Sequence, residues 1–252
     1  MRFIAMHKLD QHSEAGLPPS QELMAAVGKL ISDGVATGVF LSGEGLHPSS
    51  TRTRLKFSGG QCTVTHGPFT GSNELMAGFA MLQVKSKEEA IEWARRLAQV
   101  VGDGDIGDVN IEVGQVKDPW DLGVGPKPEG APLRFLLLVK ADEASEAGLP
   151  LSPQRIAEMA NLTDEMTKAG VFLLAEWLQP SSQGARLRLS EGKRSVIDGP
   201  FIESKELIGG YAIIQVKSKA DAMEWASGFA QVLSSANVEG DIEMDIRPLH
   251  QT

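Results

Sequence analysis

The sequence has few of the residues that mark secreted or metal-binding proteins. It contains one cysteine, Cys62, and its five histidines are not arranged with it at the spacing of zinc ligands. A single cysteine has no partner for an internal disulfide, which is typical of proteins from a reducing compartment. The apolar run that begins near Met1 is too short for a signal peptide or a membrane span. We therefore expect a cytoplasmic protein without a metal site.

Basic residues are also scarce relative to acidic ones. The chain has 24 Lys and Arg against 33 Asp and Glu, which gives a net charge of −9. Proteins that hold the phosphate backbone of nucleic acids concentrate positive charge on one face, and this sequence has no such concentration. It also lacks glycine-rich phosphate-binding patterns and nucleophile motifs. These absences argue against nucleic-acid partners, kinases and hydrolases, and we expect no cofactor.

The sequence contains one unit twice. A shift of 132 residues aligns Arg2-Phe3 with Arg134-Phe135 and continues without a gap to Val100 and Val232. About half of the aligned residues are identical, a degree of self-similarity that indicates a duplicated domain.

Beyond this alignment the two copies need a slip of one residue, which pairs Ile111-Glu112 with Ile242-Glu243. Between them lies a segment rich in proline and glycine, which is typical of a semi-extended linker. We therefore predict a first repeat at residues 1–116, a linker at 117–132 and a second repeat at 133–252.

Each repeat predicts the same order of elements. Unbroken apolar runs predict buried strands, serines ahead of helical periodicity predict capped helices, and alternation with period two predicts a hairpin. The order is strand, helix, strand, hairpin, strand, helix, strand, which is the split βαβ or ferredoxin-like arrangement of the α+β class with an inserted hairpin. In the second repeat we expect strands at 134–140, 171–176, 211–216 and 242–246, a hairpin at 186–197, and helices capped by Ser152 and Ser218, with Ser20 and Ser86 as the matching caps of the first repeat.

The apolar strands need cover on both faces of their sheets. Two helices cover only one face, so something else must cover the other. We predict that the two repeats pack sheet to sheet, so that one chain imitates a homodimer. On this view the protein is an internal pseudo-dimer that exists as a monomer or a weak homodimer.

The most specific motif follows the hairpin. In the second repeat it reads Asp198-Gly199-Pro200-Phe201, and Glu203-Ser204-Lys205-Glu206 and Gly209-Gly210-Tyr211 follow it. Upstream, Glu176-Trp177-Leu178-Gln179-Pro180 and Glu44-Gly45-Leu46-His47-Pro48 form a second shared element. These motifs resemble those of the YCII-related proteins of the DGPF type. The resemblance occurs twice and covers nearly the whole chain.

The resemblance implies a dimeric α+β barrel and a largely unassigned function. Some proteins of this family are thought to be cofactor-independent acid–base enzymes that act on small molecules, including dehydrochlorinases of aromatic breakdown. Others sit beside extracytoplasmic-function sigma factors. The first repeat departs from the pattern, because His66 replaces the motif aspartate and Gly71-Ser72-Asn73 replaces the Glu-x-Lys portion. A site that retains the family pattern is therefore expected in the second repeat.

Four residues are candidates for acid–base chemistry. Asp198 precedes Gly-Pro at the end of a strand, where an aspartate either accepts the N–H groups of its own turn or acts as a general acid or base. His66 occupies the matching position, and an imidazole suits proton transfer near neutral pH. Glu176 and Glu44 each end an apolar strand, where a charge needs a partner.

Four further residues are candidates for substrate binding. Arg186, Arg188 and the matching Arg54 lie on one face of the hairpin. They form either a solvated cationic face that discourages edge pairing or a bidentate anchor for an anion. Glu206 recurs in the first repeat as Glu74 and is the fourth candidate.

Two classes of function fit these residues. The first is binding of a small anionic or aromatic molecule in clefts beside the Gly-Pro-Phe turns, with cofactor-independent isomerisation or elimination as the chemistry. Asp198 or His66 would then move the proton, Glu176 or Glu44 would assist, and an arginine would hold the substrate. The second is a non-catalytic module that responds to a ligand or binds a protein such as a sigma factor.

Overall fold

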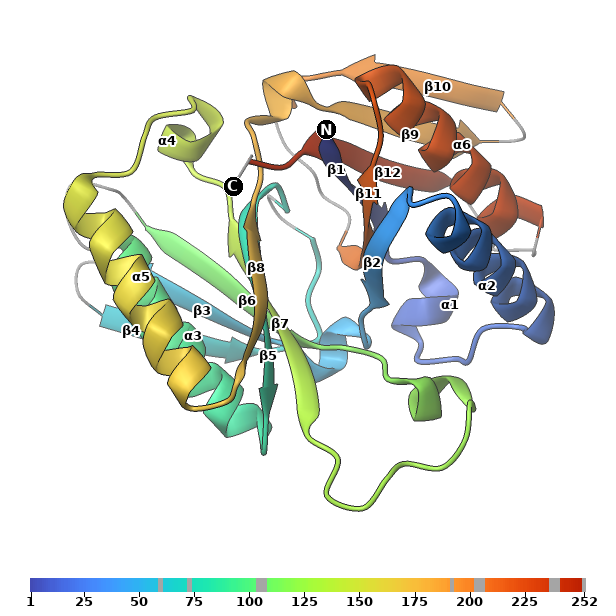
Figure 1. Cartoon of the computed structure of the whole chain (residues 1–252). Coiled ribbons are helices and arrows are strands. Elements are labelled where there is room, and N and C mark those ends of the chain that lie inside the picture. Colours follow the sequence, from blue (N-terminus) through green and yellow to red (C-terminus); the bar gives the residue numbers. More distant parts are fainter. Residues whose placement is uncertain are drawn as a thin grey trace. The chain divides into compact units, whose positions relative to one another are not determined.

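The described residues form two six-stranded antiparallel sheets and the helices that cover them, as seen in a computed structural model (Figure 1). The structure describes residues 1–58, 61–71, 74–102, 108–190, 193–201, 207–235 and 241–250. The first repeat supplies β1 (Arg2–Lys8), α1 (Gln11–Glu14), α2 (Gln21–Ala36), β2 (Phe40–Gly45), η1 (Ser49–Thr51), β3 (Thr53–Ser58), β4 (Gln61–His66), β5 (Met76–Val84), α3 (Lys87–Gly102) and β6 (Val109–Gln115). After η2 (Pro119–Leu122), the second repeat supplies β7 (Leu133–Lys140), α4 (Glu143–Glu146), α5 (Pro153–Lys168), β8 (Phe172–Trp177), η3 (Ser181–Gln183), β9 (Ala185–Ser190), β10 (Lys193–Asp198), β11 (Ile208–Gln215), α6 (Lys219–Ser235) and β12 (Ile242–Pro248).

The chain divides into two compact units. Unit 1 comprises Met1–Pro48, Thr70–Ser72 and Leu178–Thr252, and unit 2 comprises Ser49–Phe69 and Asn73–Trp177. The strand order is β10-β9-β12-β1-β11-β2 in unit 1 and β4-β3-β6-β7-β5-β8 in unit 2. Each sheet has the ferredoxin-like order of fourth, first, third and second strand, with the hairpin beside the fourth strand. The predicted α+β class is confirmed.

Each sheet combines strands of both repeats, which we did not predict. In unit 1, β1 lies between β11 and β12 of the other repeat, so that Ala5 is opposite both Ala212 and Ile246. In unit 2, β7 lies in the same way between β5 and β6. The strands of the two repeats have such similar apolar patterns that the sequence does not specify which copy supplies a neighbour. The repeats and the compact units are therefore different divisions of the chain, and the predicted packing of one sheet on the other stays a prediction.

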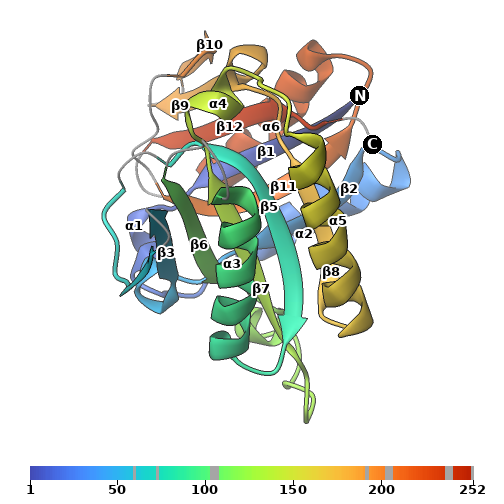
Figure 2. The same cartoon turned by 90° about the vertical axis from the view of Figure 1, so that its left-hand side faces the viewer.

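The helices of each unit also come from both repeats. In unit 2, α3 and α5 lie side by side over one face of the sheet (Figure 2), and in unit 1 α2 contacts α6. The predicted helix starts are confirmed, because each predicted cap serine accepts a backbone N–H three residues ahead. The four bonds run to Ser20, Ser86, Ser152 and Ser218 over 3.1–3.2 Å.

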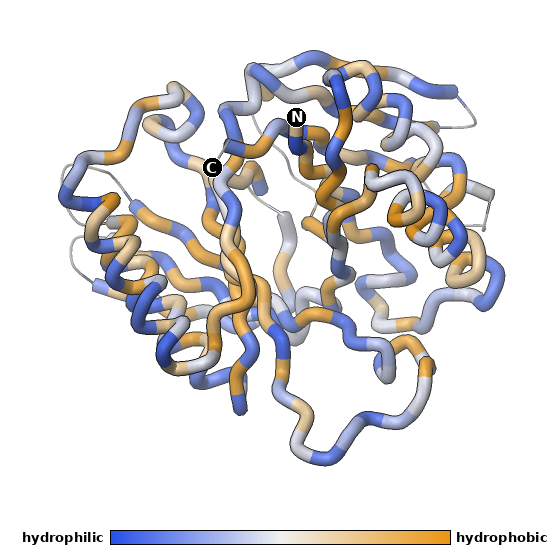
Figure 3. The backbone as a smooth tube through the Cα atoms, in the orientation of Figure 1, coloured by the Kyte–Doolittle hydropathy of each residue, from blue (hydrophilic) through white to orange (hydrophobic). Residues whose placement is uncertain are grey.

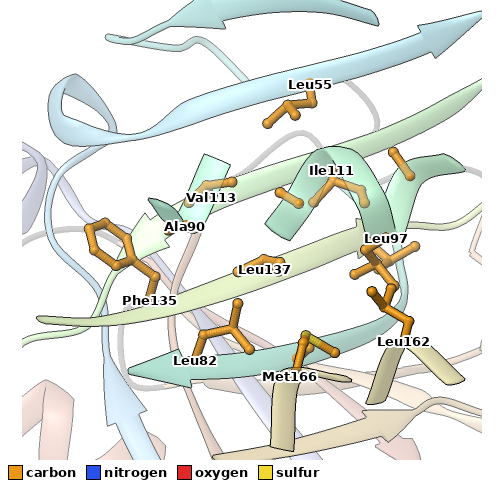
Figure 4. Packing of buried hydrophobic residues seen from close by; sticks show 14 of the residues in the cluster. Leu55, Leu82, Ala90, Leu97, Ile111, Val113, Phe135, Leu137, Leu162 and Met166 are labelled. Carbon is orange, nitrogen blue, oxygen red and sulfur yellow. The ribbon is translucent and has the colours of Figure 1, made fainter. Parts of the chain in front are cut away.

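The core of each unit lies between its helices and one face of its sheet. In unit 2, Leu137 and Ile111 from the sheet pack with Leu97 of α3 and Met166 of α5 (Figure 4). In Figure 3, β7 and β8 are mostly apolar, whereas the helices alternate between polar and apolar residues. Complete burial of one leucine contributes about 2 kcal/mol, so this layer fixes the sheet that carries the polar residues described next.

Candidate functional site

Each Gly-Pro-Phe turn is held by a buried serine. The Oγ of Ser49 accepts the N–H of Phe69 at 2.9 Å, and the Oγ of Ser181 accepts the N–H of Phe201 at 3.0 Å. Both glycine–proline bonds are cis. A Cβ at Gly199 would lie 1.8 Å from the carbonyl oxygen of Ser181. The turn therefore requires glycine for close backbone approach, and its two copies have the same construction.

We expect Gly199→Ala to destabilise the protein by about 2–3 kcal/mol, because a backbone carbonyl occupies the position of the new methyl group. The matched control is Gly228→Ala in α6, where a Cβ meets nothing within 4 Å and alanine should stabilise the helix by up to about 1 kcal/mol. Urea unfolding of both variants measures the two effects. Equal midpoints for the two variants would refute the steric role of the turn.

Asp198 lies at the helix-covered face of its sheet and is largely exposed. It pairs in register with Ala185, which belongs to the core under α6. Its carboxylate accepts a hydrogen bond from Lys219 Nζ at 2.7 Å, and 78% of the side chain is exposed. Lys219 also donates to the carbonyl of Gly184 at 2.7 Å. The ion pair thus connects the start of α6 to the hairpin, on an open surface.

His66 occupies the corresponding place in unit 2. It is exposed, and its Nδ1 lies 3.0 Å from the Oγ1 of Thr53, its register partner on β3. Lys87, the counterpart of Lys219, donates to the carbonyl of Thr51 at 2.7 Å. The contact with the hydroxyl of Thr53 holds the ring of His66 at the helix-covered face.

Arg54 lies on the opposite face of that sheet, in a network of buried charges. Its Nε donates to Glu112 at 2.7 Å and its Nη2 donates to Glu74 at 2.8 Å. Arg52 donates to Glu112 at 3.0 Å, and Lys140 forms ion pairs with both carboxylates. All but Arg54 are nearly or fully buried.

An aromatic ring completes the network. The guanidinium of Arg54 lies over the ring of Phe69 at 4.3 Å, and 23% of the arginine side chain is exposed. The phenylalanine of the Gly-Pro-Phe turn therefore supports the arginine through a cation–π contact. This contact connects the turn motif to the charge network.

Unit 1 repeats this arrangement. Arg186 donates to Asp245 from Nε at 2.6 Å and from Nη2 at 3.2 Å, and it lies over the ring of Phe201 at 4.6 Å. Lys8, the counterpart of Lys140, donates to Asp245 at 2.8 Å. Glu243 is a further carboxylate, 3.3 Å from Arg186.

The register corrects our alignment of the last strands. We paired Glu112 with Glu243, but Glu112 lies opposite Arg54 whereas Asp245 lies opposite Arg186. The counterpart of Glu112 is therefore Asp245, two residues further along. The repeated letters Ile-Glu suggested the wrong match, because a strand position is defined by its cross-strand partner rather than by local identity.

Each unit also has one fully buried arginine, at a different place along the chain. In unit 2 it is Arg52, and the register of β3 and β6 places Gly114 across from it. In unit 1 the arginine is Arg247, and Gly184 stands across from it, where a Cβ would be 3.1 Å from Arg247 Cγ. Arg247 donates from Nε to the carbonyl of Gln179 at 2.9 Å. In unit 1 the glycine makes room for the arginine.

The networks hold their carboxylates ionised. Burial raises the pKa of Glu112, but the charges of Lys140, Arg52 and Arg54 and the hydrogen bond from Arg54 outweigh it and lower the pKa to about 2. Burial also raises the pKa of Asp245, but the charges of Lys8 and Arg186 and their hydrogen bonds outweigh burial, so the pKa is lowered overall. Both carboxylates therefore stay negative at neutral pH.

Glu44 and Glu176 share a face with the arginines but lie far from them. Glu44 stands in one cross-strand row with Asp245 and Arg186, and Glu176 in one row with Glu112 and Arg54. Four strand spacings separate each glutamate from its arginine, which is about 19 Å. Neither glutamate therefore reaches the group that an arginine of its own sheet would hold.

The last two candidates are Arg188 and Glu206. Arg188 is half-exposed and donates from Nε to Asp241 at 3.1 Å. Glu206 lies outside the described residues. Its counterpart Glu74 is completely buried against Arg54 and Lys140. The structure thus brings together arginine and phenylalanine, and it places Asp198 and His66 on the other face of their sheets.

Sequence reasoning missed most members of the two networks. The sequence did contain a signal for these residues. Each is a charged residue inside, at the end of or directly before an apolar strand, where a buried charge requires a partner of opposite charge. The missed network residues are Lys8, Arg52, Glu112, Lys140, Glu243 and Asp245.

Other features of the described residues add no further candidate chemistry. An open depression of about 520 Å³ at the end of β1 is lined by Leu9, Asp10, Gln11, Glu14, Ala15, Gly71 and Leu207. The seven predicted site residues that the structure describes do not line it. No three His, Cys, Asp or Glu side chains among the described residues are grouped to hold a metal ion. None of the described helices is both long enough and apolar enough to cross a membrane.

Comparison with known proteins identifies the repeated unit. The model of the YCII-related domain matches residues 1–111 and again residues 133–239. An uncharacterized protein of Rhizobium meliloti (strain 1021), R00369, is 39% identical over 72 residues, which are 29% of this chain. The match spans 54% of the length of that relative. The chain therefore belongs to the YCII-related family, whose domain it carries twice.

Proposed function

We propose that this protein binds a small molecule with an anionic group at Arg54, beside the Gly-Pro-Phe turn of unit 2. The observation that carries the proposal is that the guanidinium of Arg54 is fixed in position but keeps one nitrogen without a hydrogen bond to any described residue. Nε and Nη2 are held by carboxylates and the plane lies over Phe69, so the group is fixed in position. Within the part of the chain that the structure describes, Nη1 makes no hydrogen bond. A fixed, partly exposed guanidinium edge suits a carboxylate or a similar anion.

The surrounding charges favour an anion at this place. The network of Arg52, Arg54, Lys140, Glu74 and Glu112 contains three cations and two anions, so these five side chains together carry +1. Replacing buried ion networks with apolar residues is often neutral or stabilising. The presence of such a network in both units therefore supports a role beyond stability. An aromatic body in the ligand would gain further contact with Phe69.

Binding is better supported than acid–base catalysis at the same place. A proton-transfer group must lie within hydrogen-bond reach of the bound molecule. His66 and Asp198 lie on the helix-covered faces, whereas Arg54 and Arg186 lie on the opposite faces. A ligand-binding module without catalysis is thus our leading reading, and the roles of His66, Asp198, Glu44 and Glu176 in catalysis stay predictions.

A thermal-shift screen with small aliphatic and aromatic carboxylates tests this function. A ligand at 100 times its dissociation constant stabilises the folded state by about 2.7 kcal/mol, so a binder raises the melting temperature measurably. We expect such a shift in the wild type and in His66→Gln. We expect its loss in Arg54→Lys, which keeps the positive charge but removes the planar guanidinium that binds a carboxylate through two N–H groups. Arg188→Lys is the matched control on the other hairpin. A shift that persists in Arg54→Lys would rule out this site, and no shift with any carboxylate would rule out the ligand class.

A further inference from the structure

The edge strand β10 is exposed along its whole length and carries two apolar residues. It ends the sheet of unit 1, and all six of its residues are exposed. Val196 and Ile197 are 44% and 55% exposed. An open strand edge with apolar side chains is a ready template for pairing with another strand, and proteins usually protect such edges.

The equivalent edge strand β4 of unit 2 is different. Its Val64 is partly buried against the core, and a polar Thr65 takes the place of Ile197. At the positions of Arg194 and Asp198, β4 has Cys62 and His66. The features of β10 are therefore specific to the second repeat and do not follow from the fold itself.

The hydrogen-bond pattern decides which residues of β10 face outward. The N–H of Gly199 donates to the carbonyl of Gly184 at 3.3 Å, so the odd-numbered residues of β10 exchange hydrogen bonds with β9. The backbone N–H and C=O groups of Arg194, Val196 and Asp198 consequently point away from the sheet. These three residues also share one face, because alternate side chains of a strand point the same way.

This outward row is complementary to itself. If a second β10 pairs antiparallel with Val196 opposite Val196 of the second copy, Arg194 lies opposite Asp198 of the second copy at both ends. A shift by two residues in either direction removes both charge pairs, and a shift by one residue mismatches the hydrogen bonds. The same pairing of β4 would set Cys62 against His66 and gain no ion pair.

We infer that β10 binds β10 of a second copy of this chain, which makes one sheet continuous across a two-fold axis. The bond of Asp198 to Lys219 leaves its carboxylate largely exposed, so it can also accept from Arg194 of the second copy. The contact is isologous and therefore closes as a dimer. One six-residue strand buries less surface than a standard interface, so the dimer is weak. This inference is independent of the proposed ligand.

Disulfide trapping in the full chain tests the pairing. In a Cys62→Ser background, Val196→Cys places two thiols at a hydrogen-bonded pair, where Cα atoms lie about 5.5 Å apart and a disulfide is feasible. Ile197→Cys is the matched control, because the diagonal separation of about 7–8 Å between its two copies exceeds disulfide reach. We expect covalent dimers on mild oxidation from Val196→Cys alone. Equal dimer yields from the two variants would overturn the inference.

Sedimentation of the native chain over a concentration series gives a second readout. We expect a reversible dimer that Arg194→Glu weakens by about tenfold or more, because two attractive pairs become repulsive. The charge-swapped variant Arg194→Asp with Asp198→Arg should restore the dimer, and thermal melting shows whether each variant is folded. A wild type that stays monomeric throughout the series, or a dimer that Arg194→Glu leaves unchanged, would overturn the pairing.

Discussion

Replacing Glu112 with alanine is expected to destabilise the protein by about 3–5 kcal/mol. The carboxylate is buried, with 1% of its side chain exposed, and contacts Arg52, Arg54 and Lys140. Truncation of one member of a buried ion network leaves the other charges out of water without compensation, which is the costliest outcome for such a group. Thermal or urea unfolding measures the loss of stability, which is expected in unit 2, the unit that contains Glu112.

The matched control is Asp108→Ala, which lies in the same unit as Glu112. Asp108 stands just before β6 and pairs with Lys56 at 2.6 Å, but it is 45% exposed. An exposed ion pair contributes about 0–1 kcal/mol, so this variant should melt close to the wild type. If both variants lost the same stability, burial of the network would not be what makes Glu112 important.

The same carboxylate predicts the response of the protein to acid. Lowering the pKa of Glu112 from 4.5 to about 2 corresponds to about 3 kcal/mol of stability. Because the folded state has the lower pKa, this contribution is fully present above pH 4.5 and is lost as the pH falls through about 2. Asp245 acts in the same direction. In Glu112→Gln, the loss of stability between about pH 5 and about pH 2 should be shallower than in the wild type.

The sequence predicted the features that depend on local patterns. The serine caps, the hairpin and the strand order follow from residues that are neighbours along the chain, so each repeat defines them by itself. The separation of Asp198 from Arg186 was also within reach of the sequence. Pairing Ser190 with Lys193 across the turn places Asp198 opposite Ala185, and therefore on the other face from Arg186.

The strand exchange was beyond such reasoning, and the charge networks depend on it. Lys140 comes from the second repeat, yet it pairs with Glu74 and Glu112 of the first. If each repeat formed its own sheet, Lys8 would take that place. The two lysines follow equally apolar strands, so no local pattern distinguishes the two arrangements. A choice between equivalent partners is made by the whole fold rather than by a segment.

Disulfide mapping of cysteine pairs tests the strand exchange most directly. In a Cys62→Ser background, Ala5→Cys with Ala212→Cys joins register partners on β1 and β11. The control, Ala5→Cys with Ala80→Cys, joins the residues that would be partners if each repeat formed its own sheet. In the structure, Ala5 and Ala80 are buried in the cores of different units. Mass spectrometry of unreduced peptides should find the 5–212 disulfide and not the 5–80 disulfide, and the opposite result would show that the repeats do not exchange strands.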